Sequence, residues 1–181
     1  MSRPCVIVGL LALLCSLGPA ATQTRVRATL SAASERLPAP AFQLRDAAGK
    51  PIALSQFRGR PVVVNLWATE CGGCRLELPS FVALHRAVTG AAVIGVSMDV
   101  MCDGLQNAAE GWAKVRSFAA SHQLRYTILM DDGSVEKAYH VTAMPATYLI
   151  DRRGRIAARY VGVVDEANLN ANVRKLLSEA K

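Results

Sequence analysis

The sequence WATECGGC at residues 67–74 decides the fold of this 181-residue chain. It follows an apolar run, PVVVNL at residues 61–66, which predicts a buried strand. It precedes apolar residues at helical spacing, among them Leu78, Phe81 and Val82. A strand, a short turn and a helix are therefore predicted in succession, with two cysteines at the junction of strand and helix.

The spacing of Cys71 and Cys74 suits reversible disulfide chemistry. If Cys71 is the N-cap of the helix, backbone N–H groups of the first turn point toward its sulfur and favour the thiolate. A separation of three residues within a helical turn also suits the geometry of a disulfide. This segment is therefore predicted to supply a nucleophilic thiol and a resolving thiol together.

Strands and helices alternate along the rest of the chain. Strands are predicted at residues 41–44, 52–54, 62–67, 92–97, 126–130, 147–150 and 156–160, and helices at residues 74–88, 112–121, 135–139 and 165–180. Pro79 is expected to kink the first helix, and residues 101–109 are expected to form a loop. The pattern predicts an α/β fold with a central mixed β-sheet flanked by helices and an N-terminal β-hairpin extension.

The first 22 residues have the layout of a secretory signal peptide or membrane anchor. Arg3 precedes an apolar run at residues 6–17 and small residues at 18–21. Residues 23–40, rich in Ala, Ser, Arg and Pro, are expected to be a linker, and residues 41–181 the folded domain. We therefore expect an exported protein, periplasmic or extracytoplasmic, which is attached to the membrane only if the leader is not cleaved.

The number of cysteines and the distribution of charge exclude some classes of function. Beyond the leader the chain keeps Cys71, Cys74 and Cys102, which is a close pair and one further thiol rather than a disulfide scaffold. Cys102 is expected to be a loop thiol, although a third redox thiol or a soft-metal ligand is an alternative. The net charge of +7 is scattered and forms no basic stripe with aromatic residues, so no nucleic-acid partner is expected. No cofactor or resident metal is expected.

Four fragments carry a resemblance to a known family. They are RGRPVVVNLWA at residues 58–68, CGGC at 71–74, ELP at 77–79 and MPATYLID at 144–151. In this order and spacing the chain resembles the thioredoxin-like superfamily, in particular its TlpA/ResA branch of exported thiol–disulfide oxidoreductases. The resemblance runs from about residue 42 to residue 177 and implies a thioredoxin-like fold.

The resemblance implies roles for the two cysteines and for the residues around them. Cys71 is expected to attack a partner disulfide and Cys74 to resolve the product, through a redox disulfide between the two. Pro145 matches a cis-proline that faces this disulfide. The backbone of Met144 is then expected to pair with an extended segment of the partner, and Trp67 to contribute to substrate binding.

Glu77 matches an acidic residue of this branch that assists proton transfer. From spacing alone it lies one turn beyond Cys74, where a solvated carboxylate that suits the helix dipole is the alternative. Glu70 and Gly73 depart from the pattern, which commonly has an aromatic residue and a proline at these positions. A carboxylate beside Cys71 opposes the thiolate unless Arg75 offsets it, and Gly72 with Gly73 is expected to loosen the loop.

The resemblance implies a thiol–disulfide oxidoreductase that reduces disulfides of exported proteins. An upstream membrane thiol–disulfide electron donor is the expected source of electrons, and apocytochrome c or a metallochaperone are candidate clients. A peroxiredoxin-like thiol peroxidase is one alternative, although it needs a single peroxidatic cysteine in a Thr-x-x-Cys setting. A copper-binding thioredoxin-fold module is another, although such proteins usually have wider cysteine spacing and a dedicated histidine.

Overall fold

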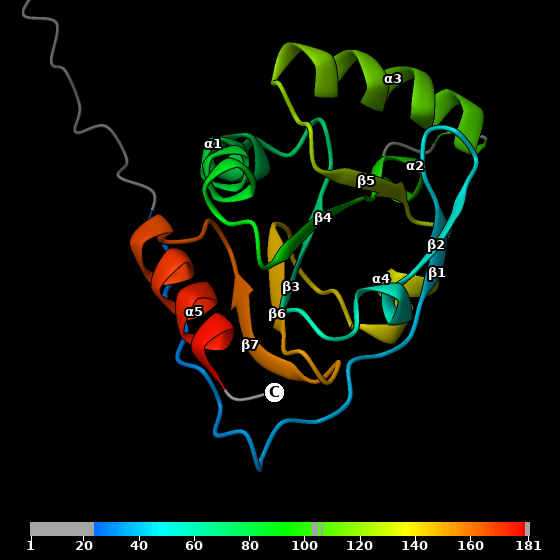
Figure 1. The fold of residues 1–181 in the computed structure, drawn as a ribbon. Helices are drawn as coiled ribbons and strands as arrows, with labels where there is room; N and C mark the ends of the chain where they lie inside the picture. The colour runs from blue at the N-terminus through cyan, green and yellow to red at the C-terminus, as the bar shows by residue number, and fades with distance from the viewer. Residues whose placement is uncertain (1–23, 103–104, 106, 180–181) are drawn as a thin grey trace, which may run out of the picture.

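The computed structural model describes residues 24–102, 105 and 107–179, which build one seven-stranded sheet in the order β2-β1-β5-β4-β3-β6-β7 (Figure 1). The strands are β1 (Gln43–Arg45), β2 (Pro51–Ala53), β3 (Val62–Trp67), β4 (Ala92–Ser97), β5 (Thr127–Met130), β6 (Ala146–Ile150) and β7 (Ile156–Val161). β4 pairs in parallel with β3 and β5, and the other pairs are antiparallel. The predicted mixed sheet and N-terminal hairpin are confirmed.

Helices cover both faces of the sheet. They are η1 (Leu54–Phe57), α1 (Gly72–Ala87), α2 (Asp99–Cys102), α3 (Ala108–Ser121), α4 (Ser134–Ala138) and α5 (Glu166–Ser178). Val63 and Trp67 of β3 belong to the core cluster with α1, α3 and α5, whereas Val62, Val64 and Leu66 belong to the cluster with η1 and α4. Because alternate residues of a strand face opposite sides, a strand covered on both faces needs an unbroken apolar run.

Three helix predictions needed adjustment. α1 begins at Gly72, two residues earlier than predicted, and includes Pro79, whose expected kink stays a prediction. α3 begins at Ala108, earlier than predicted, because the side chain of Asn107 accepts hydrogen bonds from the N–H groups of the first turn. The short helix α2 occupies the start of the expected loop at residues 101–109, of which residues 103, 104 and 106 lie outside the described residues.

The segment expected as a linker lies along the edge of the sheet. Residues 25–38, here called the N-terminal strap, pass beside α5 and β7 before the chain enters β1 (Figure 1). Val26 forms a bridge with Val164, and Pro38 forms one with Arg155. Between them, Ser31 N donates to the carbonyl oxygen of Ala157 at 2.8 Å. The strap thus supplies backbone partners to an edge strand, which otherwise offers unpaired polar groups.

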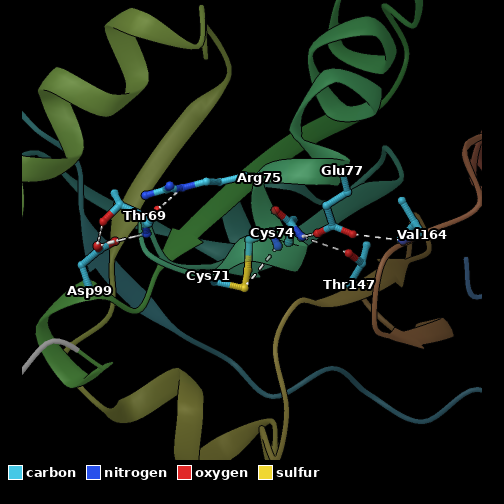
Figure 2. The surroundings of a disulfide bond; sticks show 9 residues. Thr69, Cys71, Cys74, Arg75, Glu77, Asp99, Thr147 and Val164 are labelled. Atoms are coloured by element: carbon cyan, nitrogen blue, oxygen red, sulfur yellow. Dashed lines mark hydrogen bonds between the residues drawn. A yellow bond between two sulfur atoms is a disulfide. The ribbon is translucent and has the colours of Figure 1, made fainter. Parts of the chain in front are cut away.

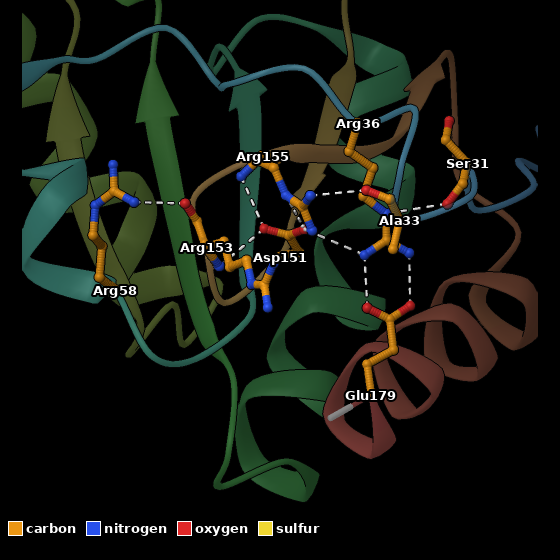
Figure 3. Close-up of polar contacts among 8 residues, drawn as sticks. All are labelled: Ser31, Ala33, Arg36, Arg58, Asp151, Arg153, Arg155 and Glu179. Atoms are coloured by element: carbon orange, nitrogen blue, oxygen red, sulfur yellow. Dashed lines mark hydrogen bonds and ion pairs between the residues drawn. The ribbon is translucent and has the colours of Figure 1, made fainter. Parts of the chain in front are cut away.

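A buried arginine anchors the strap. The Arg36 side chain is 2% exposed, and its guanidinium forms two 2.6 Å bonds with the Glu179 carboxylate and one of 3.3 Å with Asp151 (Figure 3). Arg155 donates to the same Asp151 carboxylate at 2.9 Å. Although burial opposes ionisation of Asp151, hydrogen bonds from Arg155 and Arg36 lower its pKa. A buried charge is stable only when it is paired. Composition alone, from which residues 23–40 were expected to be a linker, does not reveal this pairing.

The predicted leader, residues 1–22, lies outside the described residues. Among the residues that the structure does describe, no helix is both long and apolar enough to cross a membrane.

Candidate active site

Cys71 and Cys74 form a disulfide at the start of α1, with their Cα atoms 5.2 Å apart (Figure 2). The sheet places them there because β3 ends at Trp67 and the chain turns directly into the helix. Cys71 is partly exposed, whereas Cys74 is fully buried. A partner can therefore reach the sulfur of Cys71 and not that of Cys74.

Cys71 is the N-cap of α1, as the spacing predicts. Its backbone is extended, and its sulfur accepts a hydrogen bond from the backbone N–H of Cys74 at 3.2 Å. In the reduced protein the same donor and the positive end of the helix dipole favour a thiolate on Cys71. The first turn of α1 thus directs a backbone donor and the positive end of the helix dipole at this sulfur.

Glu77 is fully buried, one turn beyond Cys74, so it is not a solvated carboxylate. Figure 2 shows its side chain pointing from α1 toward Val164 and Thr147. The carboxylate accepts from Asn65 Nδ2 at 2.7 Å and from the backbone N–H of Val164 at 3.1 Å. Asn65 also donates to Thr147 Oγ1 at 3.1 Å, which fixes the amide between β3 and β6.

Burial and hydrogen bonding act in opposite directions on the pKa of Glu77. Burial raises its pKa from 4.5 to about 7. The hydrogen bonds from Val164 and Asn65 act in the opposite direction because they stabilise the carboxylate. A carboxyl with a pKa near the working pH can both accept and return a proton during catalysis.

Pro145 lies against the disulfide loop. The Met144–Pro145 peptide bond is cis, and a Cβ built on Gly73 lies 3.2 Å from Cδ of Pro145. Gly73 therefore allows the CxxC loop to approach the proline closely, which a larger residue at this position would oppose. Met144 is partly exposed beside this contact, where a partner segment can reach it.

Trp67 does not have the substrate-binding position that the resemblance implied. It is fully buried and stacks on Phe118, with ring centroids 5.4 Å apart. A Cβ built on Gly95 would lie 2.7 Å from its indole nitrogen, so the indole packs directly over β4. Trp67 faces α3 because residues of one strand alternate between faces.

Glu70 lies between two cations. Its carboxylate is 3.0 Å from a terminal nitrogen of Arg75 and 3.0 Å from Nζ of Lys114. Arg75 also donates through Nε to the carbonyl oxygen of Thr69 at 2.6 Å. The sequence suggested that Arg75 offsets Glu70, and the structure adds Lys114 from α3 to this group.

A buried aspartate holds the loop before Cys71. The Asp99 carboxylate accepts from the backbone N–H of Thr69 at 3.1 Å and also from the Thr69 hydroxyl (Figure 2). Ser97 Oγ donates to the same carboxylate at 2.7 Å. Asp99 is fully buried, and these donors replace the water that its charge would otherwise require. The residue after β4 is thereby tied to the segment that leads into Cys71.

Sequence reasoning assigned no role to Asn65, Asp99 or Val164. Asn65 and Asp99 carried a signal, because a polar residue within or directly after a buried apolar strand needs a specific partner. Val164 carried none, since its contribution is a backbone N–H. Cys102 is exposed on α2 and is not part of the disulfide.

Comparison with known proteins agrees with this geometry. The AhpC/TSA family profile matches residues 36–159. The thiol-disulfide oxidoreductase ResA of Bacillus subtilis is 30% identical over 162 residues, which cover 89% of this chain and 86% of that protein. The thiol:disulfide interchange protein DsbE of Pseudomonas fluorescens biotype C is 35% identical over 150 residues, 80% of this chain and 78% of that protein.

The fold has close structural counterparts. The thioredoxin domain of a thiol-disulfide oxidoreductase from Bacteroides vulgatus superposes with a TM-score of 0.65 at 25% identity. The match covers 78% of this chain and 96% of that domain.

Proposed function

Because this chain belongs to the AhpC/TSA family of thioredoxin-like proteins and is a thiol–disulfide oxidoreductase, we propose that it reduces disulfide bonds of exported proteins with Cys71 and Cys74. The observation that carries the proposal is the arrangement around the disulfide. The partly exposed Cys71 is suited to attack, the buried Cys74 to resolution, and the buried Glu77 lies one turn from Cys74.

The first step joins the protein to its client. The Cys71 thiolate attacks one sulfur of the client disulfide and forms a mixed disulfide with it. The other client sulfur leaves as a thiolate and takes up a proton. The N–H of Cys74 and the helix N-terminus stabilise the Cys71 thiolate before attack.

The second step releases the client. The Cys74 thiol gives its proton to the Glu77 carboxylate, and the resulting thiolate attacks the sulfur of Cys71. The mixed disulfide breaks, and the second client sulfur leaves as a thiolate that is protonated in turn. The client has then gained two electrons and two protons, and the protein holds the Cys71–Cys74 disulfide.

Client binding is assigned to the surface around the cis-proline. Met144 is partly exposed next to the contact of Gly73 with Pro145, which leaves it accessible to an extended client segment beside Cys71. Backbone pairing in this place supplies affinity without demanding one client sequence, which suits a reductase of several proteins.

The cellular setting follows from the predicted leader. Residues 1–22 are proposed to direct export to the periplasm or another extracytoplasmic space, with membrane attachment if the leader is retained. A membrane thiol–disulfide protein is proposed to return two electrons per cycle, and apocytochrome c is a candidate client. The names of the relatives ResA and DsbE support the thiol–disulfide exchange itself.

Trapping of mixed disulfides tests the proposal. In the Cys74→Ser variant, attack by Cys71 should proceed while resolution fails, so clients should accumulate as disulfide-linked adducts that mass spectrometry identifies. Cys71→Ser is the matched control and should trap none. Equal trapping by both variants would show that the attacking role of Cys71 is wrongly assigned. Rapid peroxide turnover without a disulfide client would favour the peroxidase alternative.

A further inference from the structure

The hydrogen bond that holds Glu77 from the side of β7 depends on the N-terminal strap. Val164 lies between β7 and α5, and its N–H donates to Oε2 of Glu77 at 3.1 Å. Its carbonyl oxygen accepts from a terminal nitrogen of Arg25 at 3.2 Å. Val164 thus connects the buried carboxylate with a residue of the strap.

Backbone hydrogen bonds with Val26 hold the two residues that flank Val164 in the chain. Val26 N donates to the carbonyl oxygen of Val163 at 2.7 Å, and Asp165 N donates to the carbonyl oxygen of Val26 at 2.8 Å. These bonds bracket Val164 within the chain. Gly162, at φ +110°, allows close approach here, since a Cβ built on it would lie 3.2 Å from Val26 Cγ1.

We propose that Arg25 and Val26 are positioning residues of the redox centre: through their bonds to Val164 and its neighbours they hold the Glu77 carboxylate in place. The inference rests on the proposed role of Glu77 as the acceptor of the Cys74 proton. It makes Arg25 and Val26, at the start of the strap, a support of the redox centre rather than part of a connection to the leader.

The groups that act on Glu77 come from several elements. Asn65 of β3 and Val164 donate hydrogen bonds, and Arg25 is the charged group that lowers the pKa of Glu77 among the described residues. Tyr126, which precedes β5, also interacts with Glu77. Burial is the larger cause that raises the pKa of its phenol, and the charge of Glu77 is the smaller one. Removing the positive charge of Arg25 should therefore raise the pKa of Glu77 further.

Arg27 provides a matched control. It belongs to the same strap and carries the same charge, but its guanidinium pairs with Asp165 at 3.4 Å, and its side chain is 68% exposed. Replacing either arginine by glutamine changes the net charge equally. Only Arg25→Gln removes the charge beside Val164.

The direct measurement is the titration of Glu77 by carbon-13 NMR in the oxidised full-length protein, in which Cys71 and Cys74 do not titrate. Glu77→Gln assigns the signal. In Arg25→Gln the midpoint should rise by about half a pH unit at low salt, as expected for an exposed charge that acts partly through solvent. Arg25→Lys should restore the wild-type midpoint because it keeps the charge, and Arg27→Gln should leave the midpoint unchanged.

Salt separates the charge effect from a structural one. Because salt screens exposed charges, the midpoints of wild type and Arg25→Gln should converge in 1 M salt, where the Debye length is about 3 Å. A midpoint in Arg25→Gln equal to that in Arg27→Gln at low salt would overturn the proposal. So would a shift that persists unchanged in 1 M salt, because it would report altered packing around Glu77.

Activity distinguishes this inference from the proposed function. At pH 7 the reduction of insulin disulfides by Arg25→Gln should fall about twofold, since a smaller fraction of Glu77 is then ionised. Wild type and Arg27→Gln should remain equal. If Glu77→Gln retains full activity at every pH, the proton-transfer role fails, whereas the NMR shift in Arg25→Gln still tests whether the strap positions Glu77.

Discussion

Asn65 Nδ2 lies 2.7 Å from Oε1 of Glu77, so a polar residue in the central strand β3 holds the one carboxylate that α1 buries behind the disulfide. The pair explains why an apolar strand carries an asparagine. A buried carboxylate needs donors, and Asn65 is placed on the face of β3 that α1 covers.

The pH dependence of stability should reveal Glu77. Its pKa is about 7 in the folded protein, against 4.5 for an unperturbed glutamate such as that of the unfolded chain, so the folded state binds the extra proton between these values. The associated stability is fully present below pH 4.5 and is lost as the pH rises through 7, by roughly 3 kcal/mol. Urea unfolding of the oxidised protein should show this loss in wild type and not in Glu77→Gln. The exposed Glu35→Gln should behave as wild type, and parallel curves for all three proteins would refute the assignment.

The charges around Glu70 make a separate prediction. Because Arg75 and Lys114 each lie 3.0 Å from its carboxylate, Glu70→Gln should change the pH profile of Cys71 alkylation by iodoacetamide only slightly. Arg75→Ala should move alkylation to higher pH, since it leaves Glu70, the neighbour of Cys71, with one cation fewer and removes the bond to Thr69. Arg86→Ala, at the far end of α1, is the control. A large shift in Glu70→Gln would show that the cations do not offset the carboxylate.

The contact of Asp99 with Thr69 should matter for stability and for turnover. Asp99→Asn places an amide where three donors converge, so we expect a loss of about 2–3 kcal/mol in the free energy of unfolding. Insulin reduction should fall as well, because the segment before Cys71 loses its support. Thr69→Ser keeps both donors and should resemble wild type. Unaltered unfolding of Asp99→Asn would mean that the loop holds its position without this carboxylate.

The buried Arg36 should tie the strap to the domain. Arg36→Ala leaves the Glu179 and Asp151 carboxylates without this cation and should cost about 3 kcal/mol. The strap should then become sensitive to limited proteolysis at residues 25–38. Arg153→Ala, which removes a nearby exposed arginine, should change neither property. Protease resistance equal to that of wild type would show that the backbone bridges hold the strap unaided.

Cys102 should be dispensable. It is exposed on α2, and the exchange between Cys71 and Cys74 is chemically complete without it. Cys102→Ser should therefore reduce insulin at the wild-type rate, as measured by turbidity. A large loss of turnover in a folded variant, or a disulfide between Cys71 and Cys102 found by peptide mapping, would instead make this a relay of three cysteines.

The sequence by itself determined the local elements and the chemistry of the pair. Apolar runs of strand length, helical periodicity and the spacing of Cys71 and Cys74 are local signals, so they predicted the mixed sheet and the N-cap position of Cys71. The motif around Pro145 predicted that this proline lies at the disulfide, where its contact with Gly73 places it. The predicted leader remains a prediction, outside the described residues.

Only the tertiary structure decided which residues surround each functional side chain. Spacing could not tell whether Glu77 is solvated, because its burial depends on Asn65 and on the N–H of Val164, which is distant in sequence. Nor could composition show that residues 25–38 form a strap, because their partners lie on β7 and α5. The burial of Trp67 could not be predicted for the same reason, because it depends on packing against Phe118 of α3. Periodicity gives the residues that share a face, but burial, pKa and partners depend on which distant segments pack against that face.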